Sequence, residues 1–343
     1  MTARTSAWLA LDVGGANIKA AHTLGVARAL PFELWKRPDE LPDVLAALGG
    51  TFPPFDRIAV TMTAELCDCY PTKAFGVNAV LDAVVTAFRG VPTRVWGVDG
   101  QFHEVADARE RPGLAAAANW LALAELAARL VAEGGGLLID VGSTTTDLIP
   151  LRHGQPLARG RTDTERLQNG ELVYAGVRRT PVHALAIELP FRGLATGLAA
   201  ELFASTLDVY LTLGEIPSDA KDFSTADGRP ATADASRDRL ARMVGADRDG
   251  FSGDDAVAFA RAADEALRNR LEAAAARACR AVGVLPQAAV IAGSGEFLAR
   301  RLAQRVIDPG GLIVSLRDAW GPVASSAGCA YALTILACED AAG

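Results

Sequence analysis

The sequence predicts an α/β protein made of two duplicated domains. Apolar segments of strand length alternate with helical segments along the 343 residues. Two hairpins, LALDVGGANIKAA at 9–21 and LLIDVGSTTTDLIP at 137–150, superpose without gaps at an offset of 128 residues. Each is an apolar strand ending in an aspartate, a tight glycine turn and a second strand. Each opens one half of the chain, which predicts two facing turns whose backbone N–H groups bind anionic oxygens.

The elements of the first half follow from apolar runs and the glycines that end them. Short apolar runs predict strands at residues 7–13, 18–24, 57–63 and 93–98. Helical periodicity or an alanine- and leucine-rich composition predicts helices at residues 72–89 and 114–133. The second of these helices is expected to stop at the three consecutive glycines 134–136.

The second half repeats the alternation of strands and helices. Strands are expected at residues 137–141, 147–151 and 288–292. Helices are expected at residues 194–213, 233–245, 254–282, from 296 onward and at 323–338. The polar stretch 217–253 is too long for a bare connection, so we expect an insertion there that includes one of these helices.

Composition excludes several classes of protein. Half of the residues are hydrophobic and 22% are charged, which is typical of a globular chain. The net charge of −7 argues against a general nucleic-acid binder. The longest uncharged run, 319–338, contains Gly321 and Pro322, which favours a buried helix over a membrane span. Five cysteines and no secretory signal predict a cytoplasmic protein without a membrane partner.

Three motifs are typical of phosphate binding. Two are the hairpin turns after Asp12 and Asp140, and the third is Gly293-Ser294-Gly295, between a strand and a helix. In order and spacing they resemble the two phosphate loops and the adenosine motif of the actin, Hsp70 and sugar-kinase superfamily. The resemblance implies two ribonuclease-H-like domains around a central cleft. The domains would be 1–133, with the C-terminal helix 323–343 packing back on it, and 134–322, with the polar insertion near 217–253.

Five longer segments narrow the resemblance. They are TMTAELCDCYPTKAFGV (61–77), AAANW (116–120), IDVGSTTTDLIPL (139–151), RLQNGELVYAGVRRTPV (166–182) and TADGRPAT (225–232). Together they resemble the hydantoinase/oxoprolinase-related proteins of the tetrahydromethanopterin- and methanofuran-linked C1 pathway. The resemblance implies a transferase that joins an aminomethylfuran-methanol diphosphate to the phenol of γ-glutamyltyramine, or of a tyrosine-based analogue, and releases pyrophosphate.

That reaction assigns expected roles to the loops. Departure of a diphosphate is helped by Mg²⁺, which Asp12 and Asp140 would hold through water. Lys19 is expected either to neutralise the diphosphate or to point to solvent. The backbone and hydroxyl donors to the phosphates are expected to be Gly14, Gly15, Asn17, Gly142, Ser143, Thr144, Thr145, Thr146, Gly293, Ser294 and Gly295.

The phenol must lose a proton, and two carboxylates are candidates for the base. Glu65 follows a buried strand, where functional residues of α/β folds collect, although a helix-capping role would explain it equally. Asp147 lies in the second hairpin, where an aspartate commonly orders its own turn.

A last group of residues is expected to meet the anionic parts of the substrates. Only four lysines occur among 34 basic residues, and Lys73 is one of them, close behind Glu65. Arg178 and Arg179 either grip a carboxylate or phosphate or form a solvated turn. Lys221 and Arg229, in the polar insertion, are either an acceptor-side lid or part of an interface.

Three functions remain open on these residues. The first is the ether-forming transferase, with a small-molecule diphosphate and a phenolic acceptor as partners. The second is an ATP-dependent small-molecule kinase or an oxoprolinase-like amidohydrolase, with an adenine pocket around Gly293 to Glu296. The third is a nucleotide-gated scaffold without catalysis. The oligomeric state is left open, with a homo-oligomer among the options.

Overall fold

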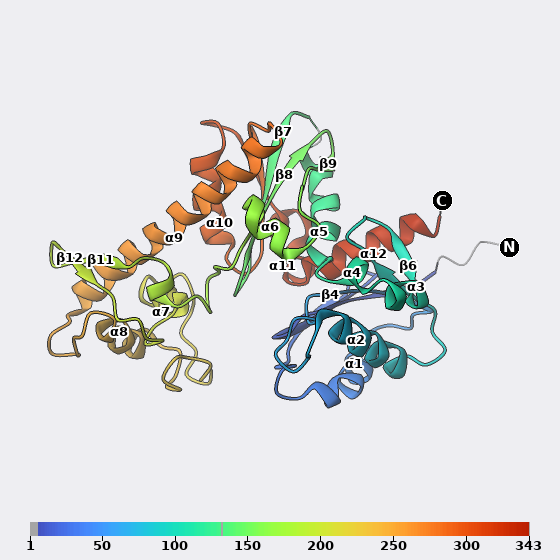
Figure 1. Cartoon of the computed structure of the whole chain (residues 1–343), viewed down its shortest axis with the longest axis horizontal. Coiled ribbons are helices and arrows are strands. Elements are labelled where there is room, and N and C mark those ends of the chain that lie inside the picture. The colour runs from blue at the N-terminus through green and yellow to red at the C-terminus, as the bar shows by residue number, and fades with distance from the viewer. Residues whose placement is uncertain (1–5, 132, 343) are drawn as a thin grey trace. The chain divides into compact units, whose positions relative to one another are not determined.

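The structure is a computed structural model that describes residues 6–131 and 133–342 (Figure 1). The chain divides into two compact units. The first unit comprises Met1–Leu138, Ile149–Gln168 and Val314–Gly343, and the second comprises Ile139–Leu148 and Asn169–Ile313.

The sheet of the first unit has the strand order β3-β2-β1-β4-β5-β6. Its strands are β1 (Trp8–Val13), β2 (Asn17–His22), β3 (Ala27–Pro31), β4 (Arg57–Met62), β5 (Thr93–Trp96) and β6 (Phe102–Glu104). Strand β2 is antiparallel to both β1 and β3, whereas β1, β4 and β5 run parallel. An antiparallel meander followed by parallel strands in the order 3-2-1-4-5 is the ribonuclease-H-like arrangement, so the predicted fold class is confirmed.

The two faces of this sheet carry different side chains because successive residues of a strand point in opposite directions. Leu9, Leu11 and Val13 face a core built with α1 (Leu41–Gly49) and α2 (Lys73–Ala87). The opposite face carries alanines, among them Ala10, Ala21 and Ala59. These small side chains let α12 (Gly328–Asp340) pack against β1, β2 and β4, and α12 also contacts α5 (Asn119–Ala128).

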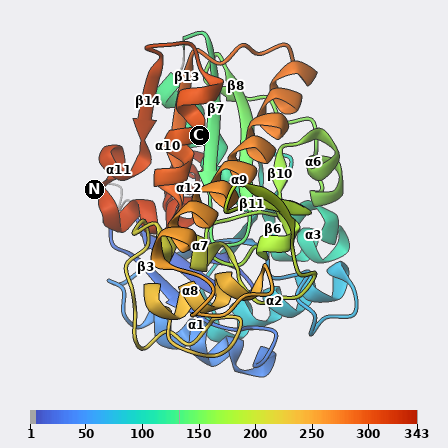
Figure 2. The same cartoon turned by 90° about the vertical axis from the view of Figure 1, so that its left-hand side faces the viewer.

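The second sheet has the order β10-β8-β7-β13-β14, with β9 paired to β8 (Figure 2). Its strands are β7 (Gly135–Val141), β8 (Thr146–Arg152), β9 (Gln155–Pro156), β10 (Leu172–Val173), β13 (Ala288–Ala292) and β14 (Leu312–Ser315). In the second unit, α9 (Gly253–Ala281) packs on α10 (Glu296–Val306). A capping box between Ser252 and Asp255 starts α9 at the position its sequence predicts.

Six further α-helices occur in the described residues. They are α3 (Val105–Glu110), α4 (Pro112–Ala115), α6 (Asp163–Asn169), α7 (Thr206–Thr212), α8 (Ala233–Arg242) and α11 (Leu316–Ser326). Within the described ranges, no single helix is long and apolar enough to cross a membrane. The pair α11 and α12 meets that test only jointly, and it is bent by 96°.

Three expected helices are wrong in extent. The helix expected at 323–338 spans the end of α11 and most of α12, which are separate helices bent by 96°. Residues 194–213 form strand β12 (Leu194–Gly197), which pairs with β11 (Glu188–Phe191), and then the short α7. The positive φ angles of Arg192 and Gly193, 50° and 81°, turn the chain between these two strands. The helix expected at 114–133 is broken instead into α4 and α5, because Ala117 adopts φ 50°.

Candidate functional site

In the first unit, Asp12 lies near the C-terminal end of β1, in a row of polar residues across the sheet. Lys19 on β2 and Thr61 on β4 are its register partners, and partners in register share a face of the sheet. Asp12 is 4% exposed and Thr61 is fully buried. The Thr61 hydroxyl has no hydrogen-bond partner among the described residues. An unsatisfied buried hydroxyl beside a carboxylate indicates a place where a polar ligand completes the site.

The charge state of Asp12 depends on its neighbours. Burial raises the pKa of Asp12, while the Lys19 ammonium and a hydrogen bond from the Asn119 amide oppose that rise. The Asn119 Nδ2 lies 3.4 Å from Asp12 Oδ1. A cation bound here would favour the ionised form of Asp12. Carboxylate and hydroxyl oxygens are ligands that a hard ion such as Mg²⁺ prefers, so Asp12 and Thr61 fit such an ion.

Glu65 follows β4 by three residues and is the second buried acid of this unit. It is 1% exposed, and its Oε2 has no hydrogen-bond partner in the described part of the chain. Burial, followed by the nearby Asp163 carboxylate, raises the pKa of Glu65 to about 7, whereas Lys73 and the Ala117 backbone favour ionisation. A carboxyl group with this pKa takes up and releases protons near neutrality, as a general base must.

The backbone around Glu65 is held closely by α2. A Cβ atom at Gly76 would lie 2.3 Å from the Glu65 carbonyl oxygen, so only glycine lets the helix approach this far. The helix starts at Lys73, and its N-cap Thr72 accepts a hydrogen bond from Phe75 N at 3.1 Å. This start places Lys73 Nζ 3.7 Å from Asp163 Oδ2.

The protonation of Glu65 predicts a pH-dependent stability. The folded pKa of about 7 lies above the ordinary value of 4.5, so folding favours the protonated form. The resulting stabilisation is complete below about pH 4.5 and is lost as the pH rises through about 7. The Glu65→Gln variant has no ionisable group at this position and does not lose this stabilisation. We therefore expect the free energy of unfolding of the variant, relative to that of the native protein, to rise by roughly 3 kcal/mol between pH 4.5 and 8. Chemical denaturation at both pH values measures it. An advantage independent of pH would contradict the assigned pKa.

The start of α5 and the turn before it contact both buried acids. Asn119 contacts Asp12, and Ala117 hydrogen-bonds to Glu65 through its backbone. The next residue, Trp120, is covered by the Arg166 guanidinium, 4.2 Å from the ring centroid. Arg166 in turn lies 3.8 Å from Asp163. Sequence reasoning assigned no role to these residues, although the segments AAANW and RLQNGELVY that carry the family resemblance contain Asn119, Trp120 and Arg166.

The first glycine loop is closed by its own backbone. Gly14 N donates to Asn17 O at 3.0 Å, which occupies the Gly14 N–H that was expected to bind phosphate. A Cβ atom at Gly15 would lie 2.6 Å from Cys67 Sγ, so the loop rests directly on the segment that follows β4.

In the second unit, the loop after Asp140 is shaped by a neighbouring segment. Gly142 N donates to Thr145 O at 2.8 Å and closes the turn. The N–H groups of Val177, Arg178 and Arg179 bond to carbonyl oxygens of Gly142 or Ser143, each at 3.0 Å. The Ser143 and Thr144 hydroxyls lie 3.4 Å apart and are half-buried. The loop is therefore preformed, which favours binding of an anion without reorganisation.

Gly176 is essential to this shape. A Cβ atom there would lie 2.5 Å from Gly142 O and 2.6 Å from Thr144 N. We expect Gly176→Ala to displace the loop, weaken pyrophosphate binding and lower the free energy of unfolding by about 1–3 kcal/mol. Calorimetric titration and thermal melting measure the two effects. Gly253→Ala is the matched control because a Cβ atom there meets nothing within 4 Å. Equal behaviour of the two variants would contradict the prediction.

The Gly-Ser-Gly motif packs on the end of β7. Gly293 adopts φ 89°, and a Cβ atom there would lie 2.4 Å from Asp140 Oδ1. Gly295 N donates to Val141 O at 2.8 Å, and the buried Thr146 hydroxyl donates to Ala175 O at 2.7 Å. Neither donor is available to a phosphate, which corrects the expected roles of Gly295 and Thr146. Ser294 is exposed.

Some of the basic residues expected to bind substrate form ion pairs, and others are exposed. Arg178 forms an ion pair with Asp222, and Arg179 is exposed. Arg229 binds Asp227 at 2.7 Å and Asp238 at 2.9 Å. These two carboxylates engage Arg229 in an ion-pair network of the polar insertion, and its role in a lid or an interface stays a prediction. Lys221 is exposed.

The structure thus gathers the candidate residues into two sets, one in each unit. The first unit holds Asp12, Lys19, Glu65 and Lys73. The second unit holds Asp140, Asp147, the 143–145 loop, the 293–295 turn and Arg178. Among the described residues, no group of three or more His, Cys, Asp or Glu side chains could hold a metal ion. Bound Mg²⁺ would therefore need water or phosphate oxygens, as is usual for this ion.

Comparisons with known proteins agree on the family. A family model described as Hydantoinase/oxoprolinase matches residues 56–336. The (4-{4-[2-(gamma-L-glutamylamino)ethyl]phenoxymethyl}furan-2-yl)methanamine synthase of Methanocaldococcus jannaschii is 38% identical over 255 residues, which cover 74% of this chain and 76% of the relative. The synthase of the same name from Methanococcus vannielii is 38% identical over 124 residues, which cover 36% of this chain and 55% of the relative.

Among solved structures, component A of the Acidaminococcus fermentans (R)-2-hydroxyglutaryl-CoA dehydratase is similar over 98% of this chain and 100% of that chain, with 10% identity and a TM-score of 0.48. The matched family model covers most of the sequence, and the M. jannaschii synthase covers three-quarters of it. On these matches, the chain belongs to the hydantoinase/oxoprolinase family.

Proposed function

We propose that this protein is a transferase that forms the furan–phenol ether of a methanofuran-type cofactor. The substrates would be an aminomethylfuran-methanol diphosphate and the phenol of γ-glutamyltyramine or of a tyrosine-based analogue. The bond between the furfuryl carbon and the diphosphate oxygen breaks, and a bond from that carbon to the phenol oxygen forms. Pyrophosphate leaves with the bonding electron pair, and the phenol proton passes to a base.

One observation carries this proposal. The relative that is 38% identical over 255 residues bears a name describing a phenoxymethyl group attached to a furan methanamine. That name contains the ether bond that the proposed reaction makes. The aligned region covers 76% of the relative, so the comparison reaches beyond one shared motif.

The leaving group sets the main electrostatic demand. Loss of diphosphate from a furfuryl carbon leaves a cation that the furan ring stabilises, so the protein must chiefly neutralise the departing phosphates. Bound Mg²⁺ would supply positive charge to the phosphate oxygens. We assign the buried Asp12 to that ion, with Lys19 as a second source of positive charge. The preformed loop at Ser143 and Thr144 is assigned to the phosphates.

Glu65 is the better candidate for the base. Its Oε2 has no hydrogen-bond partner among the described residues, and its pKa of about 7 matches proton transfer near neutrality. Asp147 is half-buried in β8, where it pairs in register with Leu172. Lys73 and Arg166 lie around Asp163, near Glu65, and would attract the carboxylate of the acceptor.

A paired assay on the purified protein with Mg²⁺ tests the proposal. One arm supplies the aminomethylfuran diphosphate with γ-glutamyltyramine or tyrosine, and the other supplies ATP with and without the acceptor. Mass spectrometry detects the ether, while pyrophosphate and ADP are quantified separately. Ether and pyrophosphate in equal amounts without ATP are expected.

The family description is also compatible with ATP-dependent chemistry. An oxoprolinase-like amidohydrolase or a kinase would consume ATP. ADP formation without ether would overturn the transferase in favour of that chemistry. No product in either arm would favour the non-catalytic scaffold, which retains ligand binding without turnover.

A further inference from the structure

A groove of about 770 Å³ follows one edge of the sheet in the first unit. Strand β3 forms this edge and pairs only with β2 among the described strands. The groove is lined by β3, by α1 and by the end of α11, and α11 packs beside β3 (Figure 2). The free edge of a strand, set in such a groove, is a template for pairing with another extended chain.

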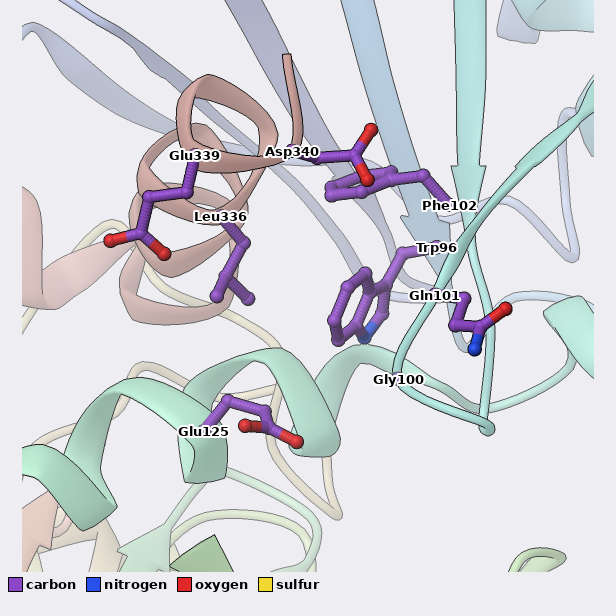
Figure 3. A pocket seen from close by; sticks show the side chains of 8 residues that line it. All are labelled: Trp96, Gly100, Gln101, Phe102, Glu125, Leu336, Glu339 and Asp340. Atoms are coloured by element: carbon purple, nitrogen blue, oxygen red, sulfur yellow. The ribbon is translucent and has the colours of Figure 1, made fainter. Parts of the chain in front are cut away.

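A second hollow of the same unit has a different character. It measures about 440 Å³ and lies among β5, β6, α5 and α12 (Figure 3). Its aromatic rings, Trp96 and Phe102, are 3% and 8% exposed and pack against each other, so they offer little surface to a ligand. The Glu339 carboxylate beside them is engaged by Arg129. The groove along β3, by contrast, exposes its apolar lining.

The lining of the groove along β3 resembles the centre of a protein–protein interface. Arg28 is the one charged residue among the described residues that line it. Val323, on α11, is 55% exposed, and Ala47 and Pro322 are also exposed. Charged residues are depleted at the centre of interfaces, whereas they are common on the rest of a protein surface. The small side chains also allow another backbone to approach closely.

The hydrogen bonds of the β2–β3 hairpin show which backbone groups of β3 remain free. His22 N donates to Val26 O at 2.8 Å, and Phe32 N donates to Ala16 O at 3.0 Å. In an antiparallel ladder, alternate residues direct their N–H and C=O groups to the same neighbouring strand. The even-numbered residues of β3 therefore bond to β2, and its odd-numbered residues direct their backbone groups away from β2, along the groove.

These outward residues are Ala27, Ala29 and Pro31, and they are complementary to a second copy of themselves. In an antiparallel pair centred on Ala29, this residue donates to and accepts from the partner's Ala29. Ala27 N–H donates to the carbonyl oxygen of the partner's Pro31. Pro31 has no N–H, but it lies at the end of the ladder, where it removes only a terminal bond.

The same register brings opposite charges together. Arg28 Nη2 donates to Thr51 O at 3.3 Å, so Arg28 lies near the C-terminal end of α1. The Leu30 end of β3 then lies toward the first turn of α1, which carries the exposed Asp43. In the antiparallel pair, the partner's Arg28 is opposite Leu30 and therefore approaches Asp43. Within the described residues, Arg28 and Asp43 have no oppositely charged partner.

We propose that this groove joins two copies of the chain into a two-fold dimer through antiparallel pairing of their β3 strands. The pairing continues the sheet of the first unit into the second copy, and apolar side chains of α1 and α11 cover the joint. A two-fold contact uses the same surface of both copies, so the assembly closes at two. It involves the first unit alone, so the proposal stands whether or not the ether-forming reaction occurs.

Sedimentation equilibrium of the whole chain at micromolar concentrations tests the proposal, and a species of twice the mass of the chain is expected. Ala29→Pro removes the N–H at the two-fold axis without breaking a bond to β2. The variant should keep the native circular-dichroism spectrum, and its dissociation constant should rise at least about tenfold. A native chain that stays monomeric, or a dimer that Ala29→Pro leaves intact, would overturn the proposal.

Charge reversal tests the register independently of the backbone. Arg28→Glu and Asp43→Arg each bring like charges together at both ends of the joint, and each should raise the dissociation constant about tenfold. The double variant restores opposite charges and should dimerise nearly as well as the native chain. Arg89→Asp, at an exposed arginine of the same unit outside the groove, is the matched control. Losses that simply add in the double variant would refute the proposed pairing.

Discussion

Replacing Glu65 by glutamine is expected to lower kcat/KM for ether formation by about 10²–10⁴-fold, the usual contribution of a general base. The amide keeps the size of the side chain but does not accept the phenol proton. In the native protein, kcat/KM should rise with pH and level off above about 7, because only the ionised carboxylate is active and its pKa is about 7. The variant should show no such rise. Initial rates between pH 5 and 9, followed as pyrophosphate release, provide the measurement.

Loss of structure is a distinct outcome in this experiment. Glu65→Gln removes a buried acid whose ionisation opposes folding, so the variant should melt at or above the native temperature at neutral pH. Glu40→Gln, an exposed acid in the same unit, controls for a general change of charge. A Glu65 variant with native rates and a native pH profile would exclude Glu65 as the base and shift the assignment to Asp147.

The hairpin duplication was sufficient to predict the fold, because each apolar strand must bury both faces and each glycine turn has few alternatives. It located Asp12 and Asp140 at comparable positions without any knowledge of packing. The helix expected at 194–213 is wrong because the local sequence pattern there does not determine the backbone conformation. Its local pattern does not reveal that Arg192 and Gly193 adopt positive φ, and a turn there converts the segment into a hairpin.

Residues that act through tertiary contacts were harder to predict. Asn119 lies 107 residues from Asp12 in the chain, and only the tertiary fold brings its amide to the carboxylate. The Asp163 and Arg166 pair reaches the Glu65 region in the same way. The ion pairs of Arg229 have a similar origin, since a lone sequence does not show that Asp227 and Asp238 engage its guanidinium.

Asp12→Asn should have the second large effect. The side chain lies between Lys19 and Thr61 in the sheet register, with Asn119 as a hydrogen-bond donor. Removing the carboxylate removes the proposed anchor for Mg²⁺, so we expect kcat/KM to fall by about 10²–10³-fold. The apparent Mg²⁺ requirement should rise, and calorimetry in the presence of Mg²⁺ should show weaker pyrophosphate binding. The latter readout does not depend on turnover.

The Asp12→Asn variant should be more stable than the native protein although it is less active. Burial raises the pKa of Asp12, so its charged form opposes folding once the pH exceeds the ordinary carboxyl value of 3.8. Asp12→Asn is therefore expected to melt above the native protein at neutral pH while losing activity. Thr61→Val, which removes the unpartnered hydroxyl at constant shape, should also raise the melting temperature. Asp82→Asn, at an exposed ion pair with Arg109, should change neither property appreciably. An Asp12→Asn protein that melts higher but keeps native activity and pyrophosphate affinity would show that this buried carboxylate serves neither the metal nor the phosphates.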